Sequence, residues 1–333
     1  MTEVKDAPPP GLREIFLTTP DITSSQWQQL SLVTRWLLMV RAPVIIMTIT
    51  STVTGILLAA ADGFSAWDIA LALLIGLSLA HACNNLVNDW TDHSTGLDAG
   101  NYFRTQYGVH VLEQRLVSQK AFAGTFVVTM VCAFAAAFYV YLQAGEEILY
   151  LTAAGSFFVF FYTWPLKHIA LGELTVLLVW GPLMTAGSYF AIAGTVNADI
   201  ILLSLFSGIG PTLVIFGKHI DKLEQDRQKG VRSLPVVLGD LKARQVTRGL
   251  IAAQWLLFPI IIWLTENLYL LLCLLAILRL GKLWRVLGEE RPQTRPGDYP
   301  ATIWPLWYSA ASFGYTRDLG LWLMAALVLD LLV

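Results

Sequence analysis

Two clusters of amide and carboxylate side chains stand at the ends of two apolar segments of this chain. In the first cluster, residues 84–92, Asn85, Asn88 and Asp92 are spaced as i, i+3 and i+7, with Asp89 beside them. Residues three and four apart share a face of a helix, so these oxygen-bearing side chains would converge. Such ligands, with one or two carboxylates, suit Mg²⁺, which completes its shell with water and phosphate oxygens. The spacing therefore predicts a metal site formed by these four residues.

The second cluster, residues 218–235, mixes acidic and basic side chains. Its acids Asp221, Glu224 and Asp226 are further candidate metal ligands. The plain alternative is a solvated loop, in which Lys222 and Asp226 would pair at i,i+4. Taken with the first cluster, however, acids that hold Mg²⁺ and flanking basic side chains that hold phosphate oxygens are what a diphosphate requires.

Membrane helices must position both clusters. Hydrophobic residues make up 56% of the 333 residues and charged residues 14%, against about 25% charged in a soluble domain. The apolar segments approach the roughly 20 residues that cross a bilayer, which predicts an all-α, polytopic membrane protein. About nine spans are expected, near residues 38–61, 66–88, 120–143, 147–164, 171–193, 199–219, 246–264, 267–287 and 303–332. The stretch 314–318, which contains Arg317 and Asp318, could divide the last span into two helices.

Basic residues fall in alternate connections between these spans. The connections near 61–63, 144–147, 194–197 and 265–267 carry no Lys or Arg. The positive-inside rule then places the N-terminus and both clusters on the cytoplasmic side. Residues 1–34 would form a cytoplasmic or interfacial segment, and residues 35–333 a transmembrane domain in the inner or plasma membrane. No basic tract of the kind that binds nucleic acid is present.

The paired motifs resemble those of the UbiA superfamily of intramembrane prenyltransferases. Asn88, Asp89 and Asp92 match the first motif, N-D-x-x-D-x-x-x-D in outline, with Asp98 as the later acid. The second motif, an acidic helix end followed by G-x-K/R-S/T-L, is matched by Asp226, Gly230, Arg232, Ser233 and Leu234. Residues 41–43 look like the family's Arg-x-Pro, and residues 162–167 resemble its short basic loop after the fourth helix. Residues 171–173 and 180–182 look most like the menaquinone-type 1,4-dihydroxy-2-naphthoate prenyltransferases. The resemblance extends from about residue 35 to residue 330.

This resemblance implies that the head of an isoprenyl diphosphate is held by Mg²⁺ at both motifs and that its isoprenyl group passes to a small aromatic acceptor. The basic residues implied to hold phosphate oxygens are Arg41, Lys167, Lys218 and Arg232. Aromatic faces would stabilise the resulting allylic cation; the candidates are Trp90, Tyr102, Phe103, Tyr162 and Tyr189. Asp92 and Asp98 are the candidate bases for the acceptor proton.

The second motif departs from the family pattern, because D-x-x-x-D ending at Asp226 would place an acid at position 222, which is lysine. On an ideal helix Asp221 lies about 140° from Asp226, against about 40° for an i,i+4 pair. Either the helix ends near Lys222, or Glu224 takes part in metal binding. A membrane terpene cyclase on the same fold therefore stays open. A transporter is the alternative from another class, although it would place charges near mid-membrane.

Overall fold

The computed structural model describes residues 8–17, 20, 22–97, 100, 109–301 and 303–332. Within these ranges all regular structure is helical, which confirms the all-α prediction. The main helices are α4 (Ala42–Ala61), α5 (Trp67–Ser94), α6 (Gln119–Ala144), α7 (Glu147–Phe161), α8 (Gly172–Leu178), η3 (Val179–Ala186), α9 (Gly187–Ala193), α10 (Ala198–Asp221), α13 (Asp240–Thr265), η4 (Leu268–Ala276), α14 (Ile277–Gly288) and α15 (Tyr308–Leu332).

Six helical segments are long and apolar enough to cross a membrane, counted over the described ranges: α4, α5, α6, α8 to α9, α10 and α13. Each of the nine ranges expected to span the membrane contains helix. The number of membrane crossings and the orientation of the chain stay predictions.

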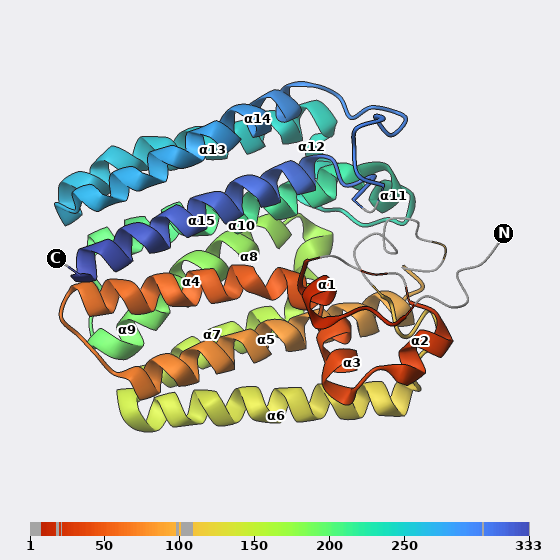
Figure 1. Cartoon of the computed structure of the whole chain (residues 1–333), viewed down its shortest axis with the longest axis horizontal. Coiled ribbons are helices and arrows are strands. Elements are labelled where there is room, and N and C mark those ends of the chain that lie inside the picture. Colours follow the sequence, from red (N-terminus) through yellow and green to blue (C-terminus); the bar gives the residue numbers. More distant parts are fainter. Residues whose placement is uncertain are drawn as a thin grey trace.

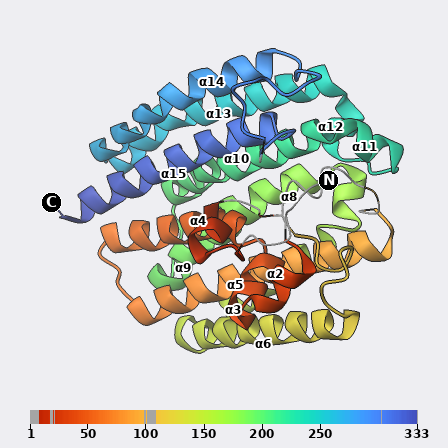
Figure 2. The same ribbon diagram turned by 45° about the vertical axis from the view of Figure 1, so that its right-hand side comes forward.

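The long helices lie side by side as a bundle, with α6 at one edge and α13 and α14 at the other (Figure 1). In its most apolar window α10 is 67% buried and α6 only 11%, so α10 is a central helix and α6 a peripheral one. The larger core cluster joins α10 to α13, α14 and α15 through residues such as Phe206, Phe258 and Tyr315. Figure 2 shows the same order of helices from a second direction.

Short helices gather at one end of the bundle. They are α1 (Leu12–Leu17), α2 (Ser24–Gln29), α3 (Leu32–Met39), η2 (Leu166–Ile169), α11 (Leu223–Gln228) and α12 (Leu234–Leu238). Helices α1 to α3 pack in a second core cluster that includes Leu86 of α5, Val109 and Phe122. This end of the bundle carries both polar clusters (Figure 1).

Helix α15 is continuous from Tyr308 to Leu332, so the possible break at residues 314–318 does not occur. Two contacts explain why polar residues are tolerated there. Thr316 Oγ1 donates a hydrogen bond to the carbonyl oxygen of Gly210 on α10, at 2.9 Å. Arg317 and Asp318 form an ion pair on the helix surface.

The fifth predicted span contains the π-helical segment η3, with Pro182 inside it. Proline has no N–H to donate, so part of the helical hydrogen bonding is lost there. Thr185 Oγ1 donates a hydrogen bond to the carbonyl of Trp180 at 3.0 Å within the same segment. Widened turns of this kind are frequent at functional sites, and this one borders the main cavity.

We expect Gly208→Ala to destabilise the protein, because α10 and η3 touch backbone to backbone at this position. A Cβ on Gly208 would lie 2.7 Å from the Cα of Gly181. Overpacking of this kind costs about 1–3 kcal/mol, so the unfolding temperature in detergent should fall. Gly249→Ala is the matched control, because a Cβ there meets no atom within 4 Å. Equal unfolding temperatures for both variants would contradict this account of the helix crossing.

Candidate active site

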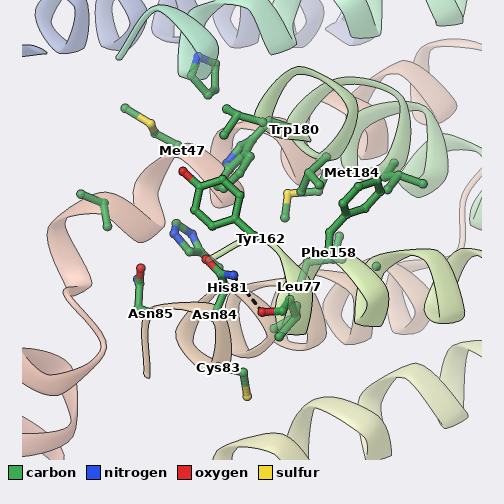
Figure 3. A pocket seen from close by; sticks show the side chains of 18 of the residues that line it. Met47, Leu77, His81, Cys83, Asn84, Asn85, Phe158, Tyr162, Trp180 and Met184 are labelled. Atoms are coloured by element: carbon green, nitrogen blue, oxygen red, sulfur yellow. Dashed lines mark hydrogen bonds between the residues drawn. The ribbon is translucent and has the colours of Figure 1, made fainter. Parts of the chain in front are cut away.

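A cavity of about 770 Å³ runs through the bundle and is lined by α4, α5, α6, α7, η3, α10 and α15. Figure 3 shows part of it, with Tyr162, Trp180 and His81 gathered at one side and Leu77 and Phe158 nearby. Cavities of about 300–1,000 Å³ with mostly apolar walls and a few polar groups are typical ligand sites. Most of its charged and amide side chains come from the end of the bundle that carries the two clusters: Arg41, Asn88, Asp92, Lys167, Lys218 and Lys222. The shape and chemistry suit a long apolar molecule with a charged head.

Helix α5 continues past the predicted end of its span to Ser94, so the first cluster occupies its last turns. Asn85 and Asp92 are each 6% exposed and Asp89 is fully buried, whereas Trp90 is 40% exposed. The spacing thus places the amides and carboxylates on the inner face, as predicted from the i, i+3, i+7 pattern.

Arg41 is held against this face by hydrogen bonds. Its Nη2 donates to Asn88 Oδ1 at 3.0 Å and to Asp89 Oδ1. Asn88 Nδ2 in turn donates to Thr163 Oγ1 at 3.2 Å, which fixes the orientation of the amide. Arg41 has φ 57°, in the left-handed region, at the turn between α3 and α4. Asn85 Nδ2 donates to the carbonyl of Val40 at 2.8 Å and so stabilises this turn.

Lys167 approaches the same site from η2. Its Nζ lies 3.7 Å from Asp92 Oδ1, and both side chains are buried. Burial and the Lys167 ammonium group lower the pKa of neighbouring His168, while the carboxylates of Asp92 and Asp226 act in the opposite direction. Lys167 and Lys222, which pair with Asp92 and Asp226, line the same cavity, so the two clusters border one cavity.

Helix α10 ends at Asp221 and α11 begins at Leu223, with Lys222 between them. This is the first of the two alternatives raised by the displaced acid. Lys222 lines the cavity, and its Nζ lies 3.5 Å from Asp226 Oδ1. The second oxygen, Asp226 Oδ2, is buried and makes no hydrogen bond to any described residue. Asp226 is not itself among the residues that line the cavity, but an orphaned buried carboxylate oxygen next to Lys222 is a candidate ligand atom.

Three other predicted residues lie apart from this group. Asp221 accepts hydrogen bonds of 3.0–3.1 Å from the backbone N–H groups of residues 307–309, at the start of α15. Glu224 is exposed and pairs with Arg227 at 3.1 Å. Arg232 is exposed and is not among the residues that line the cavity. Asp98 lies outside the described residues.

We expect Asp221→Ala to lower stability. The substitution removes the acceptor for the N–H groups at the start of α15, and loss of such a cap costs about 0.5–2 kcal/mol. Thermal unfolding in detergent measures this, with Glu224→Ala, at an exposed site, as the unchanged control. A variant with normal stability that has lost its response to Mg²⁺ would instead make Asp221 a metal ligand.

Among the predicted aromatic residues, Tyr162 lines the cavity. Trp90 instead stacks on Phe122, with centroids 6.0 Å apart, and the hydroxyl of Tyr189 donates to Asp62 Oδ2 at 2.6 Å. Tyr102 and Phe103 lie outside the described residues.

Several residues at the site were not among the site residues named from the sequence. Trp180 lines the cavity and its ring lies 5.2 Å from that of His81. His219, which also lines the cavity, is held by Glu173 through a 2.6 Å contact between Nδ1 and Oε1. Thr163 and Trp180 lie in the family-like segments 162–167 and 180–182, but neither was singled out as a site residue.

Comparison with known proteins identifies relatives of this chain. The model of the UbiA prenyltransferase family matches residues 48–306. UbiA prenyltransferase domain-containing protein 1 of Mus musculus is 26% identical over 197 residues, which are 57% of this chain and 57% of that protein. The 1,4-dihydroxy-2-naphthoate octaprenyltransferase of Escherichia coli (strain K12) is 25% identical over 227 residues, 66% of this chain and 73% of that protein. The chain spans 54–57% of the length of the first curated relatives it matches.

Solved structures share the fold. A UbiA homolog from Archaeoglobus fulgidus bound to GPP and Mg²⁺ superposes with a TM-score of 0.60 at 13% identity, covering 90% of this chain and 99% of that one. The apo structure of a UbiA homolog from Aeropyrum pernix K1 gives 0.61 at 18% identity, covering 86% and 98%. Because the family model covers well over half of the residues and the fold is that of solved homologs, this chain belongs to the UbiA prenyltransferase family.

Proposed function

We propose that this protein transfers an isoprenyl group from an isoprenyl diphosphate to a small aromatic acceptor. The observation that carries the proposal is one cavity whose polar end gathers Asn88 and Asp92 of α5, Lys167 of η2 and Lys222 of the link between α10 and α11. The chain would act as a multi-span protein of the inner or plasma membrane, because the apolar tails of isoprenyl diphosphates lie in the bilayer.

The apolar part of the cavity would hold the isoprenyl tail. Its lining on α5 runs from Ala72 to Asp92, which is about 30 Å at 1.5 Å per residue. Leu73, Gly76 and Leu77 from α5 and Phe158 from α7 form part of this wall. A tail of several isoprene units can lie along a groove of this length, away from water.

The polar end fits Mg²⁺ by the chemistry of its donors. The half-buried Asn88 and the buried Asp89 and Asp92 offer oxygen atoms on one face of α5, and Asp226 offers a buried oxygen with no hydrogen bond to a described residue. Hard oxygen donors with few carboxylates are the set that Mg²⁺ takes with a phosphate. Bound there with the diphosphate, Mg²⁺ would supply neutralisation of charge on the leaving group.

Basic side chains of the protein would bind the diphosphate head group together with the metal. Arg41, Lys167, Lys218 and Lys222 line the cavity, and their charges would hold phosphate oxygens. In the second motif, Lys222 takes the place of an acid and would act on phosphate directly. Arg232, exposed at the surface, is a weaker candidate for this part.

The reaction would proceed by heterolysis of the allylic C–O bond, with the electron pair leaving on the diphosphate. The ring faces of Tyr162 and Trp180, which line the cavity, would stabilise the cation. The acceptor's ring carbon would then form the new bond to the isoprenyl group. Asp92 and Asp98 are the proposed acceptors of the proton that is released.

The proposed acceptor is 1,4-dihydroxy-2-naphthoate. Its support is the similarity to the octaprenyltransferases of that name from Escherichia coli and Haemophilus influenzae, at 25% and 23% identity. A terpene cyclase is the second candidate, favoured by one observation: Lys222 occupies a position where the transferase pattern has an acid.

The test uses purified protein in lipid with Mg²⁺ and isoprenyl diphosphates of several lengths, with products identified by mass spectrometry. A prenylated naphthoate that forms only with both substrates supports the transferase. A cyclised hydrocarbon or alcohol formed without the acceptor would support the cyclase. Absence of diphosphate release with every chain length would overturn both.

A further inference from the structure

Two arginines and one aspartate form a charged group away from the polar end of the cavity. Arg279 of α14 reaches Asp318 of α15 with a 2.8 Å bond from Nε to Oδ2. Arg317 donates to the other oxygen of Asp318 from Nε and Nη2, at 3.1 and 2.8 Å. Two guanidinium groups thus share one carboxylate, which leaves the group with one excess positive charge.

The position of this group in the bundle is unusual for charge. Arg317 lies nine residues after the start of α15 and Arg279 nine residues before the end of α14, which is about 14 Å along each helix at 1.5 Å per residue. The two helix ends are adjacent, since the Tyr308 hydroxyl donates to the carbonyl of Glu289 at 2.9 Å. If the bundle spans a bilayer with a core of about 30 Å, the group lies inside the apolar region. Ionisable residues at such depth mark a functional site by default.

The two guanidinium groups also have N–H donors that are not used in hydrogen bonds to described residues. Their side chains are 48% and 51% exposed, against 21% for Asp318. Both Nη atoms of Arg279 and the Nη1 of Arg317 make no hydrogen bond to a described residue. Arginine presents its N–H groups as a fork that fits a carboxylate or a phosphate.

The same two arginines line the large cavity, as do the apolar residues Pro43 and Met47 of α4 and Phe313 of α15. Free donors, excess positive charge and an apolar wall therefore meet at one place. We propose that Arg279 and Arg317 form a binding site for the carboxylate or phosphate of an amphipathic molecule whose apolar part lies in the cavity.

Two sources share this chemistry: a carboxylated aromatic acceptor and an anionic lipid. The aromatic acceptor as the ligand rests on the proposed function, whereas the existence of an anion site does not. The expected effects follow from charge alone. Arg317→Gln and Arg279→Gln should each weaken anion binding about tenfold or more, since hydrogen bonds to charged groups are the strong ones. Asp318→Asn should strengthen binding, because it removes the competing carboxylate.

The experiment measures binding of 1-hydroxy-2-naphthoate by its fluorescence to the full chain in phosphatidylcholine nanodiscs, with no diphosphate present. 1-Naphthol, which lacks the carboxylate, is the matched ligand, and Arg285→Gln, an exposed arginine of α14 outside the cavity lining, is the matched variant. We expect the two Arg→Gln variants to raise the Kd of 1-hydroxy-2-naphthoate only, Asp318→Asn to lower it, and Arg285→Gln to leave it unchanged.

A second arm counts phosphatidylglycerol bound to the same variants by native mass spectrometry. Loss of bound phosphatidylglycerol with unchanged 1-hydroxy-2-naphthoate binding would make lipid phosphate the ligand. If neither anion responds, or if Asp318→Asn weakens binding as the arginine substitutions do, the three residues are a structural ion pair and the proposal fails. Both arms measure binding and not turnover, so they test the anion site even if the protein does not catalyse prenyl transfer.

Discussion

Asp92→Asn is expected to lower the rate of Mg²⁺-dependent prenyl transfer by about three orders of magnitude, since charge stabilisation by a bound metal is worth several kcal/mol. Asp92 lines the cavity on the inner face of α5 and is 6% exposed. Its carboxylate is proposed both to hold the metal and to take up a proton, and an amide does neither as well. Initial rates at varied Mg²⁺ concentration provide the measurement.

Asp68→Asn is the control for this substitution, because Asp68 is an acid of the same helix at its opposite end, bonded to the Tyr139 hydroxyl at 2.8 Å. Its rate should match that of the unmodified protein. A rate for Asp92→Asn within a few-fold of the unmodified protein, at every Mg²⁺ concentration, would remove Asp92 from the site.

Arg41→Met is expected to lower the free energy of unfolding by about 3–5 kcal/mol, because it removes one partner of a buried ion pair. The other partner, Asp89, is fully buried. The double variant Arg41→Met/Asp89→Asn should regain most of the lost stability, since an amide is far less costly to bury than a carboxylate. Prenyl transfer should stay low in both variants, because a phosphate-holding cation is missing.

Unfolding in detergent measures these free energies, and Arg285→Met, at an exposed site, controls for the loss of an arginine. If the double variant is as unstable as the single one, the buried pair is not the source of the loss. If it also regains transfer activity, Arg41 has no part in holding the diphosphate.

The sequence was sufficient to predict the helical fold and the first cluster, because hydropathy and helical spacing are local properties. Asn85, Asn88, Asp89 and Asp92 follow one stripe of α5, and all of them except the half-buried Asn88 are buried. The predicted span ended at residue 88, where polar residues end the apolar segment, but the helix continues to Ser94.

The second cluster could not be resolved from the sequence, because tertiary contacts decide it. Asp221 bonds to the backbone N–H groups of residues 307–309, which are far away in the chain. Lys222 pairs with Asp226, as the solvated-loop alternative expected, but the pair is buried and Lys222 lines the cavity. The position of Trp180 in the cavity wall likewise depends on the π-helical segment around Pro182. The hydrophobic periodicity of the sequence does not indicate where such a segment lies.

The most direct test of the central claim is an experimental structure of the protein with Mn²⁺ in place of Mg²⁺ and a non-hydrolysable geranyl thiodiphosphate. The account predicts an anomalous metal signal beside the carboxylates of α5, with the phosphates between Lys167 and Lys222 and the geranyl chain along the apolar wall of the cavity. A metal and diphosphate bound elsewhere, with the polar end of the cavity holding neither, would contradict it.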